Sequence, residues 1–130
     1  VGDELLTPTR LYAPSIVKLL REYKVKKIVS GMAHITGGGL EGNLVRALHD
    51  GVDAEIQRGS WAPHPVFPFL QSLGGVEDEE MDRVFNMGVG YCVIVRPSFA
   101  DSVAAKLRKS GERVLQIGTI VNGTGRIRLS

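Results

Sequence analysis

The stretch from His34 to Leu40 reads His-Ile-Thr-Gly-Gly-Gly-Leu, and no other segment of the sequence is better suited to bind a small anion. It lies where a predicted strand turns into a predicted helix. Glycine adopts positive φ angles without steric cost and lets the backbone approach a ligand closely. The first amides of a helix lack internal partners and suit a phosphate or a carboxylate. A glycine triplet that serves only the shape of the turn is the open alternative.

Three polar side chains beside this loop strengthen the binding hypothesis. Asn43 and Arg46 are three residues apart, so they share one face of the helix. Arginine matches a phosphate through paired hydrogen bonds. His34 precedes the loop near the end of its strand, where it would donate to a phosphate or transfer a proton. A solvated Arg46 and a His34 that bonds backbone carbonyls are the structural alternatives.

Two further clusters are weaker candidates. Asn86 lies in Phe-Asn-Met-Gly-Val-Gly, residues 85–90, where it would either hold a polar ligand group or cap the end of a helix. Thr9 and Arg10 offer a hydroxyl and a guanidinium before the first long helix, and Thr9 is also a candidate N-cap. Both clusters therefore have an interpretation that needs no ligand.

Several function classes are disfavoured. The sequence has no Walker loop, no recognisable Ser-His-Asp order and no clustered metal ligands, so we expect no metal site. A net charge of +2 does not indicate a nucleic-acid partner, and the cluster Lys24, Lys26 and Lys27 is interpreted as a solvated turn. The single Cys92 excludes an internal disulfide and lies in an apolar run, as a buried residue would. No apolar run reaches the ~20 residues of a membrane span, and no signal peptide is apparent, so we expect a cytoplasmic protein.

Hydrophobic spacing predicts the elements that position these residues. Helices are predicted at 16–23, 40–48, 65–73, 77–85 and 98–107, and strands at 28–36, 53–57, 87–95, 114–121 and 126–129. The strand at 87–95 is nearly all apolar, which is typical of a central strand. Ser98 and Asp101 resemble a capping box, and residues 122–125 predict a tight hairpin. We expect one α+β domain over 1–130, an α/β sandwich in which a mixed β-sheet packs with helices.

Taken together, these motifs resemble the C-terminal domain of aminoimidazole ribonucleotide synthetases. The resemblance rests on the opening Gly-Asp-Glu-Leu-Leu-Thr-Pro-Thr-Arg-Leu-Tyr at 2–12, on 34–40 with Asn43 and Arg46, on 79–81 and 85–90, and on the closing segments 117–118 and 123–129. It covers essentially the whole chain in the right order. It implies that domain's fold, with the family's N-terminal ATP-binding domain absent from this sequence.

The resemblance also implies a reaction. ATP phosphorylates the formyl oxygen of formylglycinamidine ribonucleotide, an internal nitrogen attacks, and the imidazole ring closes with release of ADP and phosphate. ATP and Mg²⁺ would be bound mainly by the N-terminal domain and its mate in a cytoplasmic homodimer, so this chain alone is expected to be inactive. The residues implied to bind the ribonucleotide are His34, Thr36, Gly37, Gly38, Gly39 and Asn43, with Thr9, Arg10, Arg46 and Asn86 as weaker members. Whether His34 is a catalytic acid–base or only a binding residue stays open.

Two alternatives stay open as well. The first is another enzyme of the same superfamily, such as formylglycinamidine synthetase, selenophosphate synthetase or thiamine-monophosphate kinase, which sequence beyond the chain would separate. The second is a non-catalytic nucleotide-binding module, which a start codon immediately before Val1 would favour.

Overall fold

The structure, a computed structural model, describes residues 2–8, 10–23 and 28–130. Thr9 and the lysine cluster at 24–27 therefore lie outside the described residues. The α-helices are α1 (Gly2–Leu6), α2 (Ala13–Glu22), α3 (Gly39–Leu44), α4 (Val66–Gly74), α5 (Asp78–Val84) and α6 (Ala100–Lys109). The strands are β1 (Val29–His34), β2 (Val52–Ile56), β3 (Tyr91–Val95), β4 (Gly118–Asn122) and β5 (Ile127–Leu129). Short 3₁₀ turns cover Val45–Ala47, Arg58–Ser60 and Pro97–Phe99.

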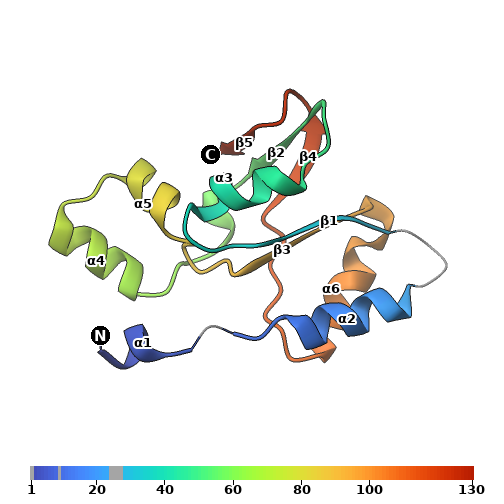
Figure 1. The fold of residues 1–130 in the computed structure, drawn as a ribbon, viewed down its shortest axis with the longest axis horizontal. Helices are drawn as coiled ribbons and strands as arrows, with labels where there is room; N and C mark the ends of the chain where they lie inside the picture. Colours follow the sequence, from blue (N-terminus) through green and yellow to red (C-terminus); the bar gives the residue numbers. More distant parts are fainter. Residues whose placement is uncertain (1, 9, 24–27) are drawn as a thin grey trace.

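An antiparallel ribbon of β1 and β3 runs through the middle of the molecule, between two layers (Figure 1). On one side lie α2 and α6, whose buried Leu19, Val103 and Leu107 pack with Val93 of the ribbon. On the other side lie α3 and the second sheet, where Leu40 joins a cluster that includes Cys92 of β3. The apolar spacing along α2 and α6 places each helix on the ribbon. The predicted α+β class is confirmed, with its strands divided between two small sheets.

The second sheet is mixed and has the order β4-β2-β5, in which β2 pairs antiparallel with β4 and parallel with β5. The predicted hairpin at 122–125 is therefore wrong, because the chain crosses to the far edge of β2. The carboxylate of Asp53 on β2 explains the crossing. Its Oδ1 accepts hydrogen bonds of 2.8 Å from the amides of Thr124 and Arg126, and its Oδ2 lies 2.8 Å from Arg128 Nη2.

Two local capping predictions are also wrong. Helix α2 begins at Ala13 with Tyr12 before it, so its N-cap position is not Thr9. Helix α6 continues directly from the turn Pro97–Phe99, and neither Ser98 nor Asp101 makes a side-chain cap bond. The preceding 3₁₀ turn carries the chain into the helix instead. Gly111, with φ 93°, follows α6 as the predicted helix stop.

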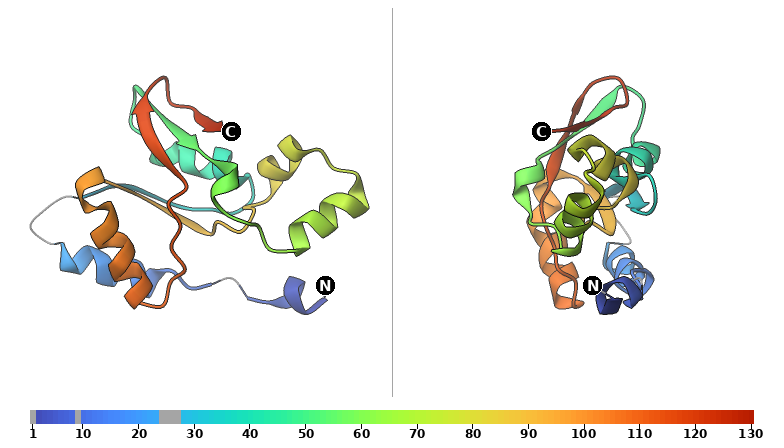
Figure 2. Two further views of the ribbon diagram at one scale, coloured as in Figure 1. Left: turned by 180° about the vertical axis from the view of Figure 1, so that it is seen from behind. Right: turned by 90° about the vertical axis from the view of Figure 1, so that its left-hand side faces the viewer.

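The strand β3 departs from its predicted central place. Within the described residues it pairs with β1 alone, and the second sheet is separate. The predicted strand at 114–121 forms a ladder only from Gly118, and the segment before it passes the ribbon on its way from α6 to β4 (Figure 2). An apolar run predicts that both faces of a strand are buried, but it does not predict how many other strands pair with it.

Helix α4 lies apart from both layers, whereas α5 packs against α3 (Figures 1 and 2). Helix α4 follows Pro65 and ends at Gly75, whose left-handed φ of 59° closes it as expected for a C-terminal glycine. In α5, Met81 is buried as predicted, whereas Val84 is exposed. No helix in the described part of the chain is long and apolar enough to cross a membrane.

Candidate functional site

The glycine loop connects the end of β1 to the start of α3. Its backbone turns through left-handed conformations at Gly38 (φ 99°) and Gly39 (φ 64°), and Gly37 has no positive φ. The amide of Gly39 donates to the carbonyl of Thr36 over 3.1 Å. Among the described residues, the amides of Gly37 and Gly38 make no hydrogen bond. The turn therefore presents two unpaired backbone donors, and Gly37 is exposed.

Asn43 holds this loop in place from inside. Its side chain is buried, and Nδ2 is shared among the carbonyl oxygens of Thr36 (3.2 Å), Gly37 (3.2 Å) and Gly39 (2.8 Å). Its Oδ1 accepts a hydrogen bond of 3.3 Å from the Thr36 hydroxyl. These bonds use the amide's donors and its acceptor, so Asn43 positions the loop in this structure.

Replacing Asn43 by alanine is expected to loosen the loop. The change leaves three carbonyls without their shared donor, which costs about 1–3 kcal/mol when such groups are buried. Urea denaturation should show the lower free energy of unfolding. Arg46→Ala is the matched control, because Arg46 is exposed and has no side-chain partner in the described part of the chain. Equal stability of the two variants would contradict the positioning role of Asn43.

Gly39 has a different role from its two neighbours. It is buried, and a Cβ built on it would overlap the backbone oxygens of Asp82 and Phe85. Its missing side chain lets α5 pack against the start of α3. The Asp82 carboxylate forms an ion pair with Arg58 at the same place. Burial raises the pKa of Asp82, although the Arg58 charge opposes that rise.

His34 is exposed at the end of β1 and lies in an aromatic cluster with Tyr12 and Tyr91. Its ring centroid is 5.8 Å from that of Tyr12, edge to face, and 6.1 Å from that of Tyr91, stacked. Burial, and then the charge of Glu112, raise the pKa of Tyr12. Sequence reasoning missed both tyrosines. The sequence does not reveal that His34 lies opposite Tyr91 across the ladder, because that depends on the pairing of distant strands.

Arg10 is held by the segment that follows α6, where its partner Glu112 is 102 residues away in sequence. Its Nε donates to Glu112 Oε2 over 2.7 Å, and its Nη2 donates to the carbonyl of Gly111 over 2.6 Å. Ser15 donates to the other carboxylate oxygen, at 2.8 Å. The guanidinium therefore has protein partners on two of its nitrogens. Its neighbour Thr9 lies outside the described residues.

Asn86 and Arg46 are not joined to the glycine loop by any hydrogen bond in the described structure. Asn86 Oδ1 accepts a bond of 2.9 Å from the amide of Gly88, which closes a turn with positive φ at Met87 and Gly88. The side chain of Asn86 thus bonds within this turn, and the residue at the end of α5 is Phe85. Trp61 supports the turn through Nε1, which donates to the carbonyl of Met87 over 2.9 Å.

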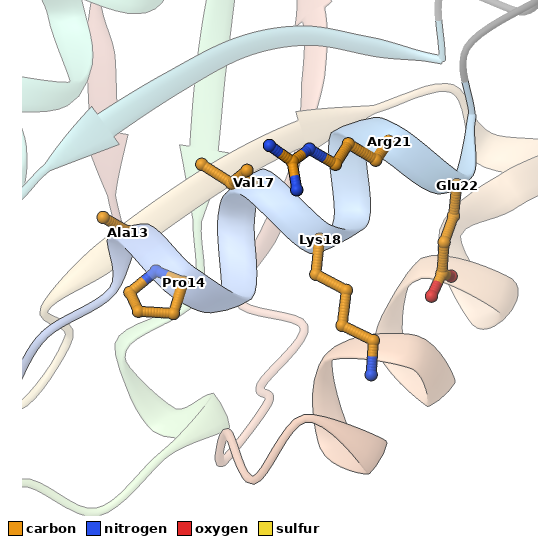
Figure 3. A pocket seen from close by; sticks show the side chains of 6 residues that line it. All are labelled: Ala13, Pro14, Val17, Lys18, Arg21 and Glu22. Carbon is orange, nitrogen blue, oxygen red and sulfur yellow. The ribbon is translucent and has the colours of Figure 1, made fainter.

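Two hollows lie away from the glycine loop. A cavity of about 930 Å³ lies beside β3, and Arg10, Tyr12 and Trp61 are among its lining residues. A shallow surface hollow lies on the outer side of α2 (Figure 3). Its lining residues are Ala13, Pro14, Val17, Lys18, Arg21 and Glu22.

No group of three or more His, Cys, Asp or Glu side chains in the described part of the chain is arranged to hold a metal ion. Cys92 is buried, as predicted, and burial raises the pKa of its thiol to about 12, so it is no thiolate nucleophile at neutral pH.

The family described as AIR synthase related protein, C-terminal domain, matches residues 1–129. The chain therefore belongs to this family. The resemblance found in the sequence motifs is confirmed over nearly the whole chain.

Curated relatives are named phosphoribosylformylglycinamidine cyclo-ligase. The protein from Burkholderia cenocepacia (strain HI2424) is 47% identical over 120 residues, covering 92% of this chain and 33% of the relative. That from Thermoanaerobacter sp. (strain X514) is 46% identical over 129 residues, covering 99% and 37%. That from Bacillus cytotoxicus is 44% identical over 125 residues, covering 96% and 35%. The chain thus spans about a third of the length of these relatives.

Among solved structures, the chain is similar to E. coli HypE, a hydrogenase maturation protein. The TM-score is 0.66 at 23% sequence identity, and the match covers 98% of this chain and 39% of HypE. This likeness confirms the α+β fold of the family.

Proposed function

We propose that this chain is the C-terminal domain of a phosphoribosylformylglycinamidine cyclo-ligase, and that it contributes to the cleft that binds formylglycinamidine ribonucleotide in purine biosynthesis. The proposal is carried by the identity of 44–47% to proteins of that name over 92–99% of the chain.

The ribonucleotide site is proposed at the glycine loop. The unpaired amides of Gly37 and Gly38 and the hydroxyl of Thr36 suit an anionic group of the substrate. The exposed imidazole of His34 stands at the base of the same loop, where it would bind the substrate or exchange a proton with it. Asn43 and Gly39 keep the loop in shape. Thr9, Arg10, Arg46 and Asn86 are proposed as secondary members.

ATP and Mg²⁺ are proposed to bind outside this chain, in the other part of a longer protein. This division rests on the resemblance to the family and on the share of the relatives, about a third of their length, that the chain covers. The proposal extends to a cytoplasmic homodimer, which rests on the resemblance to the family alone.

Turnover of formylglycinamidine ribonucleotide tests the proposed function. The complete gene product, supplied with Mg-ATP and no glutamine, should form aminoimidazole ribonucleotide with one ADP for each ring closed. The 130-residue chain alone should form none. Failure of the complete gene product would contradict the cyclo-ligase assignment and favour a related enzyme or a binding module, whereas product from the isolated chain would contradict the division of labour.

Replacing His34 by alanine in the complete gene product is expected to lower kcat/KM by about 10²-fold or more, the range of a lost acid–base group. Because His34 is exposed, the thermal midpoint should change little. His49→Ala is the matched control, an exposed histidine away from the loop. Steady-state kinetics with normal values for the His34 variant would remove His34 from the site.

A further inference from the structure

Three aromatic rings meet at the end of β1, beside the glycine loop. The ring centroids of Tyr12 and Tyr91 are 5.4 Å apart, and each of these rings also contacts the imidazole of His34, at 5.8 Å and 6.1 Å. Aromatic pairs at such distances attract each other beyond the area that they bury. His34 is exposed, whereas both tyrosines are half-buried. The imidazole therefore reaches solvent while two better-buried rings limit its orientations.

Gly90 provides the space in which the Tyr12 side chain lies. A Cβ built on Gly90 would overlap the hydroxyl and the ring of Tyr12, and its three nearest atoms all belong to that side chain. Gly90 has no positive φ, so its backbone conformation does not require a glycine. Its carbonyl accepts a hydrogen bond of 2.9 Å from the amide of Ile35, the residue that follows His34. The Tyr12 ring thus lies against the part of the ladder that carries His34.

The backbone on both sides of Tyr12 is held by one carboxylate. Arg10, two residues before it, and Ser15, three residues after it, both donate to Glu112, over 2.7 Å and 2.8 Å. Ser15 is buried and the Glu112 side chain is only 14% exposed, so the bond between them is largely shielded from water. The carbonyl of Tyr12 accepts the amide of Ile16 over 3.1 Å, at the start of α2. Both the backbone and the ring of Tyr12 are therefore held in place beside the imidazole.

We propose that Tyr12 is a positioning residue for His34: packed on Gly90, it holds the exposed imidazole in the orientation in which it meets the substrate at the glycine loop. The proposal rests on the proposed function, in which His34 binds the substrate or exchanges a proton with it. A group that acts on a substrate must be held close to its productive geometry, and the packing of its neighbours does this. Arg10 then contributes to the site through the position of Tyr12.

Steady-state kinetics of the complete gene product test whether Tyr12 acts through His34. Tyr12→Ala should lower kcat/KM by about three- to tenfold, the range of one lost aromatic pair. Tyr12→Phe keeps the ring and should stay within about twofold of the unsubstituted protein. In a protein that already carries His34→Ala, Tyr12→Ala should cause no further loss, because the side chain that it positions is gone. A loss of the same size in that background would overturn the proposal, since Tyr12 would then act on the fold alone.

Tyr23→Ala is the matched control for these variants. Tyr23 lies at the other end of α2, where its ring contacts Phe99 edge to face. Its replacement removes a comparable aromatic contact from the same helix, and we expect kcat/KM to stay unchanged. Equal losses of kcat/KM for Tyr12→Ala and Tyr23→Ala would overturn the proposal.

Gly90→Ala displaces the Tyr12 ring by a second route. The new Cβ meets the far end of a side chain, so the ring of Tyr12 has to move and the backbone does not. Gly90→Ala should therefore lower kcat/KM to about the level of Tyr12→Ala, and combining the two should cause no further loss. Losses that multiply in the combined variant would overturn the proposal.

The nuclear magnetic resonance signal of the His34 imidazole gives a readout that needs no turnover. In the complete gene product with isotope-labelled histidine, this signal is the one that His34→Ala removes. Tyr12→Ala and Gly90→Ala should each move it, because the ring beside the imidazole is gone or displaced, whereas Tyr23→Ala should not. An unmoved signal would overturn the proposal. A moved signal without turnover would contradict the proposed function alone, and normal turnover of Tyr12→Ala would contradict the positioning role alone.

Discussion

Replacing Gly39 by alanine is expected to lower the free energy of unfolding by about 2–5 kcal/mol, a large share of the stability of a domain of this size. Two costs combine. The left-handed φ of 64° strains a residue with a side chain, and the new Cβ would overlap the carbonyl oxygen of Asp82. That oxygen belongs to the backbone of α5, so relief requires the helix to move. Urea denaturation measures the loss.

The neighbouring glycine provides a control in the same loop. Gly37 has no positive φ, and a Cβ built on it meets nothing within 4 Å. Gly37→Ala should therefore change stability by less than about 0.5 kcal/mol, as exposed substitutions usually do. The same variant should weaken substrate binding in the complete gene product if the loop binds the ribonucleotide. Equal destabilisation by the two alanines would contradict the distinction between packing at Gly39 and access at Gly37.

Replacing Asp53 by asparagine is expected to lower the thermal midpoint by about 5–10 °C, because the buried carboxylate that holds the second sheet together loses its charge. The Asp53 carboxylate accepts hydrogen bonds from the amides of Thr124 and Arg126 and forms an ion pair with Arg128. It thereby holds the segment that connects β4 to β5. Calorimetry should show the loss. Glu55→Gln is the matched control, an exposed carboxylate on the same strand. Equal midpoints for the two variants would contradict the role of Asp53.

The same carboxylate predicts how stability responds to acid. The backbone amides of Arg126 and Thr124, and then the charge of Arg128, hold the pKa of Asp53 below its ordinary value. A lowered folded-state pKa gives stability that is fully present above the unfolded pKa, near 3.9, and is lost as the pH falls through the folded value. We therefore expect the thermal midpoint of the unsubstituted chain to decrease when the pH is lowered below about 4. The Asp53→Asn variant should show a shallower fall.

Local patterns predicted the place of every α-helix except α1 (Gly2–Leu6), but they predicted the pairing of the strands poorly. Helix α2 with Pro14 in its first turn and α4 between Pro65 and Gly75 follow from periodicity and terminal residues, which are properties of neighbouring residues. The hairpin at 122–125 was also predicted from neighbouring residues. The path of this segment instead depends on its hydrogen bonds to Asp53, about 70 residues earlier in the sequence. Turn residues alone therefore do not determine which edge of β2 the last strand joins.

The candidate site shows the same division. The glycine loop was predicted from its residues, and its position between β1 and α3 is confirmed. Asn43 was predicted to lie beside the loop and to bind the ligand. It does lie beside the loop, but its side-chain amide donates to the loop carbonyls. The two tyrosines beside His34 were not predicted. Tyr91 lies there because β3 pairs with β1, and Tyr12 lies there because of the path of the segment before α2. Their approach depends on tertiary structure that no local spacing encodes.

The pairing of Arg10 with Glu112 has a consequence for how the chain acquires its structure. Two of the contacts described above join residues 102 and 97 positions apart, and both end on Glu112. Folds that depend on such distant partners form slowly, because long stretches of chain must be ordered before the contact is made. During synthesis on the ribosome, α2 emerges about 90 residues before the carboxylate that anchors its start. The apolar face of α2 has no α6 to pack against until then, so α2 is made well before it can be secured, and chaperones would encounter it in that interval.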